Sequence, residues 1–457
     1  MKIILIILLL TNSFIFAEIP EKALTLDDVI AMSRQSLDFK KINISVMELE
    51  RSNDQLFYYY FPKLEMNTSA NYDHYADSSN SSQNTIMGLN LTQNFIFNSK
   101  LSATLSGTNL FEEKYNMGKR FSVSLSADIH YKMKLMQEYD TQKRYNMIQK
   151  LQVDESAREF YLNVIDRFYS LYRSISQFEI ETKGYELSLK HYNEGVAKYK
   201  AGIIPEVEML DLELYLQRKE LSLKRSKNAL SYAKEDFNRY FNLPLDYEIR
   251  VKHALEVVDE YLIDIHSDLE KILNSNPDLL ITKYNIENKS DEIIDVHRSK
   301  SIKGNIGVSF STESTNTDYD LNFDENAGTT SYYLGLTIPI FDKGEFFNSL
   351  DIAKLNYKLA KEEYRNKEKE LENTLRAKVR TLNLNYENLK ISKKSFELSE
   401  KIYNISQKRF ENGLITSKDF IQNQIDYMNN KQDMINSEID YILMVYEYKK
   451  FIGIDLF

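Results

Sequence analysis

Residues Lys198–Leu210 read Lys-Tyr-Lys-Ala-Gly-Ile-Ile-Pro-Glu-Val-Glu-Met-Leu, and a variant of this stretch returns 211 positions later (409 minus 198) as Arg409–Ile421, Arg-Phe-Glu-Asn-Gly-Leu-Ile-Thr-Ser-Lys-Asp-Phe-Ile. A long helical pattern precedes each copy, and a second one follows it. The glycine in each copy, Gly202 or Gly413, supplies a left-handed stop for the first helix, and the residues after it suit the start of the next. Each copy therefore predicts the tip of a helical hairpin, and the chain is interpreted as a tandem duplication.

The N-terminal residues 1–17 predict a compartment. They hold one early lysine, the apolar run Ile3–Leu10 and the small Ala17, which together are typical of a cleavable secretory signal; the alternative is a buried N-terminal helix. No other segment approaches the run of about 18 apolar residues that a spanning helix needs. The chain has no cysteine, which excludes a lipidated cysteine, thiolate metal sites and disulfides. We expect an exported protein without a lipid anchor.

Charge and chemistry exclude several classes of function. With 58 Lys and Arg against 68 Asp and Glu, the net charge of -10 argues against nucleic acid as a partner. No Ser/His/Asp arrangement or phosphate-binding loop is visible. The six histidines are scattered without metal-ligand spacing, at His74, His130, His191, His253, His266 and His297. The sequence therefore predicts no enzyme, no metal site and no other cofactor.

The first helix of each copy has a recognisable start. Thr25 can cap a helix that Pro62 ends, and Ser267–Glu270 has the pattern of a capping box. The predicted organisation is repeat 1 at residues 18–242 (helix 25–61, strands within 64–131, long helix 131–199, return helix 205–242), a connecting segment 243–266, and repeat 2 at residues 267–457 (helix 268–301, strands within 304–341, long helix 344–412, return helix 417–453).

Strands are predicted after the first helix of each copy. In copy one, Leu64–Tyr72 and Phe121–Ile129 alternate between apolar and polar residues. The opening strands of the two copies are 240 positions apart (306 minus 66), so copy one holds 29 additional residues (240 minus 211). These fall roughly at residues 85–111, alternate as well, and predict an added hairpin. About ten residues suffice for a tilted strand to cross a bilayer, and the alternative is the edge of a soluble sheet.

The segment after the strands predicts an unusually long helix. Tyr131–Tyr199 is a helical pattern of 69 residues, which at about 1.5 Å per residue would be roughly 100 Å long. Its apolar residues step by four and three, the spacing of a coiled-coil seam. They are Tyr161, Ile165, Phe168, Tyr172 and Ile175 in copy one, and Leu375, Val379, Leu382, Tyr386 and Leu389 in copy two. We interpret this stripe as structural packing.

These residues together resemble the TolC family of outer-membrane efflux proteins over essentially the whole mature chain. The specific signs are Leu24–Asp28 at the start, Leu336–Gly344 after the second strand pair, and Arg409–Ser417 with Asp419 at the tip. The resemblance implies a mostly α-helical fold with membrane β-strands, in which a long α-helical coiled-coil barrel and β-barrel strands are completed by a homotrimer.

The resemblance also implies a function. We expect a channel-tunnel in the outer membrane with a long periplasmic portion, serving as the passive exit duct of a tripartite efflux or type I secretion system. Its implied partners are a periplasmic adaptor protein, an inner-membrane pump and outer-membrane lipid. The alternative is a structural coiled-coil protein of the periplasm that transports nothing.

The number of strands in the barrel is open at this point. Copy two offers two strands and copy one two or four, which gives twelve or eighteen in a trimer. We favour twelve, with residues 85–111 as an extension, because two helical halves of nearly equal size should enclose one tunnel that a wider barrel would mismatch.

The tips are the predicted adaptor contact, at Gly202, Ile203, Gly413 and Leu414. A glycine lets a partner's backbone approach closely, and the alternative is that both glycines only end their helices. By the resemblance, the periplasmic aperture is lined by Tyr199, Glu208, Asp211, Phe410, Asp419 and Gln422. Tyr199 matches a tyrosine that helps to hold the family's tunnel closed, whereas Phe410 lacks the hydroxyl. Ile204 and Ile415 stand where the family can place an arginine, which puts the usual charged latch in question.

The acidic residues near the tips predict a selectivity. Under threefold symmetry Glu208, Asp211 and Asp419 would gather nine carboxylates at one constriction. Like charges so placed attract cations and raise one another's pKa values. The hypothesis is a cation-selective closed channel that multivalent cations block. The alternative is three acids on solvated helix faces.

Overall fold

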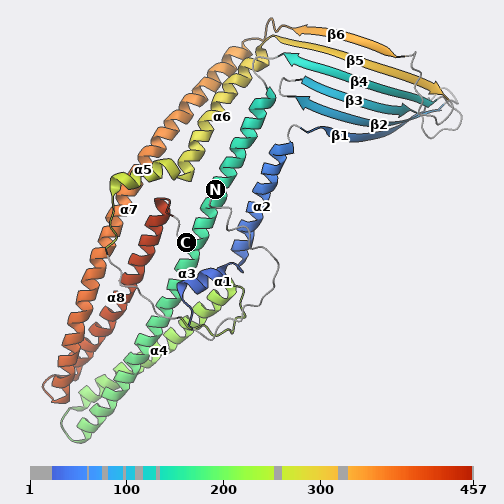
Figure 1. Ribbon diagram of the computed structural model, residues 1–457. Coiled ribbons are helices and arrows are strands. Elements are labelled where there is room, and N and C mark those ends of the chain that lie inside the picture. The colour runs from blue at the N-terminus through green and yellow to red at the C-terminus, as the bar shows by residue number, and fades with distance from the viewer. Residues whose placement is uncertain are drawn as a thin grey trace. The chain divides into compact units, whose positions relative to one another are not determined.

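A computed structural model describes residues 23–58, 61–74, 81–95, 99–108, 117–129, 134–251, 260–316 and 328–454 (Figure 1). The predicted signal at residues 1–17 lies outside these ranges. The chain divides into two compact units. Unit 1 comprises residues 1–44, 154–276 and 371–457, and unit 2 comprises residues 45–153 and 277–370.

Unit 2 contains one antiparallel sheet of six strands in chain order. The strands are β1 (Lys63–His74), β2 (Ser81–Phe95), β3 (Ser99–Thr108), β4 (Met117–Ile129), β5 (Lys303–Asn316) and β6 (Thr329–Thr337). The period-two pattern places the apolar side chains of all six strands on the same face, because pairs such as Leu64↔Leu91, Leu125↔Val308 and Ile306↔Leu334 face each other across the ladder. Most of these side chains are exposed, up to 80% for Leu334.

The added hairpin is a full part of this sheet. The strands β2 and β3 pair along their whole overlap, from Ile86↔Thr108 to Phe95↔Ser99, and they separate β1 from β4. The four strands of copy one are 12, 15, 10 and 13 residues long. The prediction that copy one contributes only two strands to the barrel, with residues 85–111 as an extension, was wrong. Alternation of apolar and polar residues predicts a strand but does not identify the strands that it pairs with.

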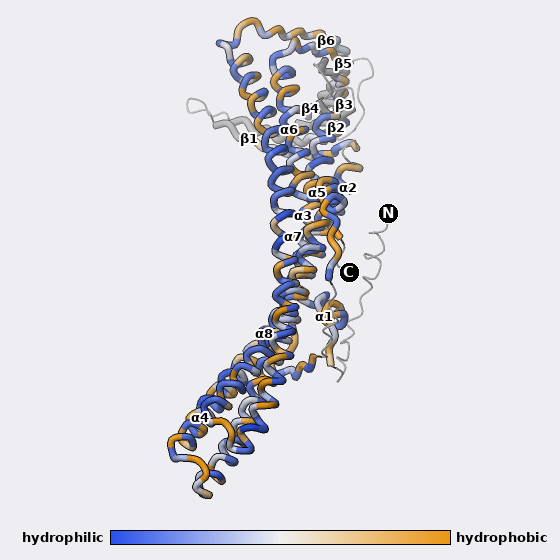
Figure 2. The backbone as a smooth tube through the Cα atoms, turned by 90° about the vertical axis from the view of Figure 1, so that its left-hand side faces the viewer, coloured by the Kyte–Doolittle hydropathy of each residue, from blue (hydrophilic) through white to orange (hydrophobic). Residues whose placement is uncertain are grey.

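The opposite face of the sheet is polar. Ser102 and Ser124 pair across β3 and β4 with their hydroxyl oxygens 2.6 Å apart. Polar residues on this face and exposed apolar residues on the other give the sheet two sides of opposite character. Within the described ranges, no helix combines the length and the apolar run that crossing a membrane requires. In Figure 2, hydrophilic and hydrophobic residues are interspersed along the long helices.

The duplication holds at the level of whole helices. The long helices α3 (Lys134–Lys200) and α7 (Glu345–Glu411) both have 67 residues. The return helices α4 (Glu206–Tyr240) and α8 (Ser417–Phe451) both have 35 residues. Each boundary recurs at the offset of 211, including the left-handed residue that follows the return helix, Asn242 in copy one and Gly453 in copy two.

The predicted first helix of each copy is broken in two. Instead of one helix over residues 25–61, the chain forms α1 (Leu26–Ser33) and α2 (Leu37–Tyr58). The break follows from Ser36, whose hydroxyl oxygen accepts the Phe39 N–H at 3.3 Å and so starts a new helix.

In copy two, the predicted helix 268–301 is likewise divided into α5 (Ile265–Ser275) and α6 (Pro277–Lys300). Pro277 lacks an N–H, and the preceding Asn276 is extended with φ -66° and ψ 122°. Both breaks lie at the same repeat position, since 277 minus 37 is 240.

The two predicted helix starts had different outcomes. Thr25 accepts the Asp28 N–H at 3.3 Å and its own N–H donates to that carboxylate at 2.8 Å, which confirms the cap. The predicted box at Ser267–Glu270 was wrong. The cap of α5 is Asp264, which accepts the N–H groups of His266 and Ser267 at 3.1 and 3.3 Å and therefore starts the helix earlier.

Unit 1 holds the main apolar core, in which the helices pack through the predicted seams. Ile165, Phe168 and Tyr172 of α3 are buried with residues of α4 and α8, and Tyr161 and Ile175 are partly buried against the same cluster. In α7 the corresponding seam of Leu375, Val379, Leu382 and Leu389 is buried as well. Coiled-coil spacing therefore predicted these core residues correctly.

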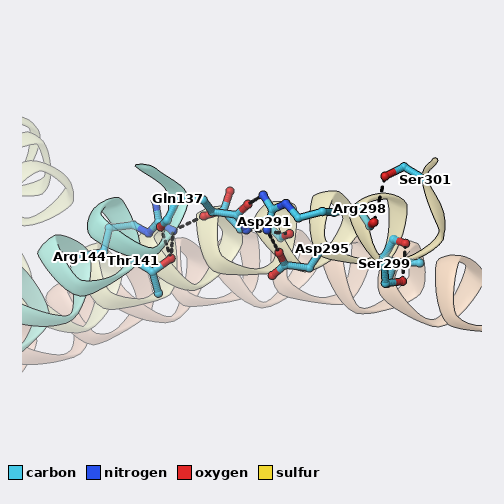
Figure 3. Close-up of polar contacts among 9 residues, drawn as sticks. Gln137, Thr141, Arg144, Asp291, Asp295, Arg298, Ser299 and Ser301 are labelled. Atoms are coloured by element: carbon cyan, nitrogen blue, oxygen red, sulfur yellow. Dashed lines mark hydrogen bonds and ion pairs between the residues drawn. The ribbon is translucent and has the colours of Figure 1, made fainter. Parts of the chain in front are cut away.

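In unit 2, polar contacts join α3 to α6 (Figure 3). Arg144 of α3 makes an ion pair with Asp291 and donates from Nε to Asn288 at 2.9 Å. Gln137 donates to the backbone carbonyl of Asp291 at 3.2 Å and accepts from Arg298. Such a network fixes the register of two neighbouring helices.

Candidate functional site

Both tips end their first helix in the same way. Gly202 and Gly413 have φ values of 70° and 68°, which is the left-handed region that the sequence predicted. In the first tip, the N–H of Ile203 donates to the Lys198 carbonyl and that of Gly202 to the Tyr199 carbonyl, both at 2.9 Å. The second tip repeats these two bonds, so each turn is a Schellman motif.

The helices after the tips start differently. Thr416 caps α8, because its hydroxyl oxygen accepts the Asp419 N–H at 3.2 Å and its O–H donates to the Asp419 carboxylate at 2.8 Å. Pro205 occupies the equivalent position in α4 and offers no side-chain cap. Asp419 therefore contributes to a helix start as well as carrying charge at the tip.

The predicted contact residues of the tips point outward. Ile203 and Leu414, which follow the two glycines, are 64% and 72% exposed. A Cβ atom added at Gly202 or at Gly413 would meet no atom within 4 Å. The turns therefore leave free space in which another molecule can approach the backbone.

The predicted aperture residues do not share one environment. Asp211, Asp419 and Gln422 are exposed, Glu208 is half-buried and Tyr199 is 39% exposed. Gln422 donates to Asp426 at 2.8 Å, four residues further along α8. In the part of the chain that the structure describes, the side chains of Glu208 and Asp211 form no ion pair.

Phe410 is different from the other predicted residues because it is buried. Its ring stacks on Phe420 with 4.8 Å between centroids and 9° between planes. Together with His191, Leu212 and Tyr403 these two rings form a group that we call the tip cluster, with members from α3, α4, α7 and α8. The prediction that Phe410 lines the aperture was wrong, since the apolar ring fills the junction of four helices.

A cation joins the two hairpins above this cluster. Lys198, near the end of α3, donates from Nζ to the Phe410 carbonyl oxygen at 2.6 Å. The same Nζ lies 4.3 Å from the centroid of the Phe410 ring, which is cation–π distance. A charged link between the tips therefore exists although Ile204 and Ile415 replace the expected arginines.

Sequence reasoning missed His191 and Phe420. Phe420 is fully buried, and His191 is 1% exposed with its ring 4.5 Å from that of Phe420 at 77°. Comparing the repeats does not identify His191, because its counterpart Ile402 is 51% exposed. The available signal was that His191 is next to Tyr192, a residue of the predicted seam. The spacing of apolar residues does not tell which of two neighbouring residues is buried.

Several polar atoms in this region are buried without a hydrogen-bond partner in the described chain. They are Nε2 of His191, the hydroxyl of Tyr403 and both amide atoms of Gln424. Burial raises the pKa of Tyr403 to about 12 and lowers that of His191. Both side chains are therefore neutral at neutral pH.

Comparison with known proteins agrees with this geometry. Residues 269–442 match the family model described as outer membrane efflux protein. No protein in a search of curated sequences matches. Solved structures with this fold include the outer membrane channel CmeC of Campylobacter jejuni, with 16% identity, a TM-score of 0.66 and coverage of 96% of this chain and 90% of that one.

Two further structures match over a similar length. The outer membrane protein VceC of Vibrio cholerae has 11% identity and a TM-score of 0.69, covering 94% of this chain and 96% of its own. The MtrE outer membrane channel of Neisseria gonorrhoeae has 12% identity and a TM-score of 0.67, covering 94% and 89%. These matches agree with the resemblance in the sequence: residues 269–442 match the outer membrane efflux protein family, and the whole chain has the fold of these outer membrane channels.

Proposed function

We propose that three copies of this protein form the passive exit duct of a tripartite efflux or type I secretion assembly. The duct receives its cargo from an inner-membrane pump through a periplasmic adaptor, and the pump supplies the energy. The observation that carries the proposal is the sheet of unit 2, whose apolar face is exposed and whose outer strands β1 and β6 each lack a second neighbour among the described strands.

Hydrocarbon does not tolerate unpaired backbone groups, so both edges of this sheet need partners in a membrane. Pairing of β1 in one copy with β6 in the next satisfies both edges at once. Six strands in each of three copies then give eighteen strands in the closed barrel. The exposed apolar face would contact outer-membrane lipid, and the polar face with Ser102 and Ser124 would line the pore.

The helices support the same assembly. Two apolar stripes at coiled-coil spacing in unit 1 are exposed and have no partner helix within the described chain: Val207, Leu210, Leu214 and Leu221 on α4, and Leu384, Ile391, Leu398 and Ile405 on α7. Exposed seams of this length are unfavourable in water. Packing of the α4 stripe against the α7 stripe of the next copy would bury both and close a ring of helices.

The tips provide the contact with the adaptor in this proposal. Exposed Ile203 and Leu414 offer apolar side chains beside glycines whose outer side is open. Glu208 and Asp211 on α4, with Asp419, Gln422 and Tyr199, supply the polar lining of the aperture. Phe410 has no part in that lining and instead holds the tips of one chain together.

The edge pairing can be tested by disulfide cross-linking, since the chain has no cysteine. A cysteine in place of Asn67 on β1 is combined in turn with cysteines in place of Ser331, Tyr333 and Gly335 on β6. We expect one combination to give covalent trimers on oxidation. The control is the pair Ser102→Cys and Ser124→Cys, which should close within one chain because these hydroxyl oxygens are 2.6 Å apart.

A structural rod without a pore predicts a different result. Its β1 and β6 edges would not meet, so the control disulfide would form and none of the three edge combinations would. That outcome would contradict the closed barrel and favour the structural coiled-coil protein.

A further inference from the structure

His191 lies at the contact between the two hairpins. It belongs to α3, and its ring packs against Phe410 of α7 and Phe420 of α8 at centroid distances of 6.3 and 4.5 Å. Its Nδ1 atom is 3.4 Å from the Glu194 carboxylate, at the outer limit of a hydrogen bond. Its Nε2 atom is buried and has no partner among the described residues. The imidazole thus occupies a site that suits an apolar ring.

The charged groups around His191 oppose one another. On its own helix, Glu194 favours the protonated ring and Lys190 disfavours it, and these two side chains also pair with each other at 3.7 Å. From α7, Glu411 favours protonation, while Tyr403 contributes a neutral hydroxyl. From α8 the apolar ring of Phe420 packs against the imidazole, and from α4 the apolar Leu212 belongs to the same tip cluster.

Burial is the largest influence on His191, and it lowers the pKa of the ring below its ordinary value of 6.5. A group whose pKa is lower in the folded state adds stability above pH 6.5, and this contribution is lost as the pH falls from 6.5 through the lowered value. Acid therefore works against the packed position of His191.

We propose that His191 is an acid-sensitive release for the contact between the α3–α4 and α7–α8 hairpins of one chain. On protonation, Nε2 becomes a second donor in a site that offers it no acceptor. The ring then moves toward solvent and leaves Phe410 and Phe420, so the tip cluster opens while the rest of unit 1 stays packed. This release requires neither the trimer nor transport, and it is testable apart from both.

Hydrogen–deuterium exchange of the full-length protein tests the release when intrinsic exchange rates are corrected for pH. Between about pH 7.5 and pH 5, amides of residues 186–215 and 403–425 should lose protection, by at most about tenfold for each pH unit below 6.5. His191→Phe should remove this loss, because it keeps an aromatic ring and cannot titrate. His266→Gln, at an exposed histidine of α5, should keep it.

Several outcomes would overturn the proposal. An acid response of the same size in His191→Phe would show that another group is responsible. If that variant does not fold, His191→Gln and the unsubstituted protein still decide the matter. The proposal would be contradicted if His191→Gln kept the acid response or if the unsubstituted protein showed none. It would also be contradicted if the response were spread evenly over all helices.

Discussion

The Nζ atom of Lys198 donates a 2.6 Å hydrogen bond to the carbonyl oxygen of Phe410, residues that lie at the ends of α3 and α7. That carbonyl also accepts the N–H of Gly413 at 3.0 Å, so the lysine is tied directly to the turn of the second tip. Through this contact, the tip of copy one holds the tip of copy two in the same chain.

Replacement of Lys198 by Met should loosen this link. The variant loses a charge-assisted hydrogen bond and a cation–π contact, which together are worth about 1–3 kcal/mol. We expect faster hydrogen exchange at residues 408–416 with little change elsewhere. Lys200→Met is the matched control, because Lys200 is exposed and two residues away. Equal exchange in the two variants would show that the Lys198 contact does not hold the tip.

Phe420 is the centre of the tip cluster, and its truncation should be costly. Phe420→Ala removes a fully buried ring that contacts His191, Tyr403 and Phe410. Large-to-alanine changes of this kind cost about 3–5 kcal/mol. Leu414→Ala, at an exposed apolar residue of the same tip, should change stability by less than about 0.5 kcal/mol. Similar denaturation midpoints for the two variants would contradict the burial described here.

The tip glycines can be tested for two roles at once. Asn tolerates a positive φ, and a Cβ atom at Gly413 meets nothing within 4 Å, so Gly413→Asn should fold normally. Gly413→Trp should also assemble, at a cost of about 1–2 kcal/mol for the left-handed backbone. If the glycine contacts the adaptor, only the tryptophan variant loses export. Export by an assembled Gly413→Trp protein would leave the glycine as a helix stop alone.

The acidic residues should determine ion selectivity. The triple variant Glu208→Ala, Asp211→Asn and Asp419→Asn removes the carboxylates, and Asn at 419 keeps an acceptor for the Thr416 hydroxyl. We expect cation selectivity and block by multivalent cations to disappear in bilayer recordings. The double variant Glu362→Gln and Glu363→Gln on α7 controls for the loss of carboxylates elsewhere on the chain. Unchanged selectivity in the triple variant would assign the three acids to solvated surface.

Regular, long patterns made most of the fold predictable. Local sequence is enough to predict the coiled-coil steps of α3 and α7, the alternation of β4 and the glycines of the tips. The pairing partners of the strands and the breaks in the helices were harder to predict. Pro277 carried a clear signal for the break before α6, whereas the break at Ser36 depends on one hydroxyl group.

The site was harder to predict because the two repeats are equivalent in sequence position but not in surroundings. Tyr199 is partly exposed while its counterpart Phe410 is buried. Buried His191 likewise corresponds to exposed Ile402. The packing of four helices decides which residue of such a pair is buried in the tip cluster. The sequence of any one helix does not contain this information.

The most direct test of the proposed function is the conductance of the purified protein in planar lipid bilayers. A trimeric duct should insert and give discrete channel openings of uniform size. Stable trimers that insert into the bilayer and never conduct would contradict the account.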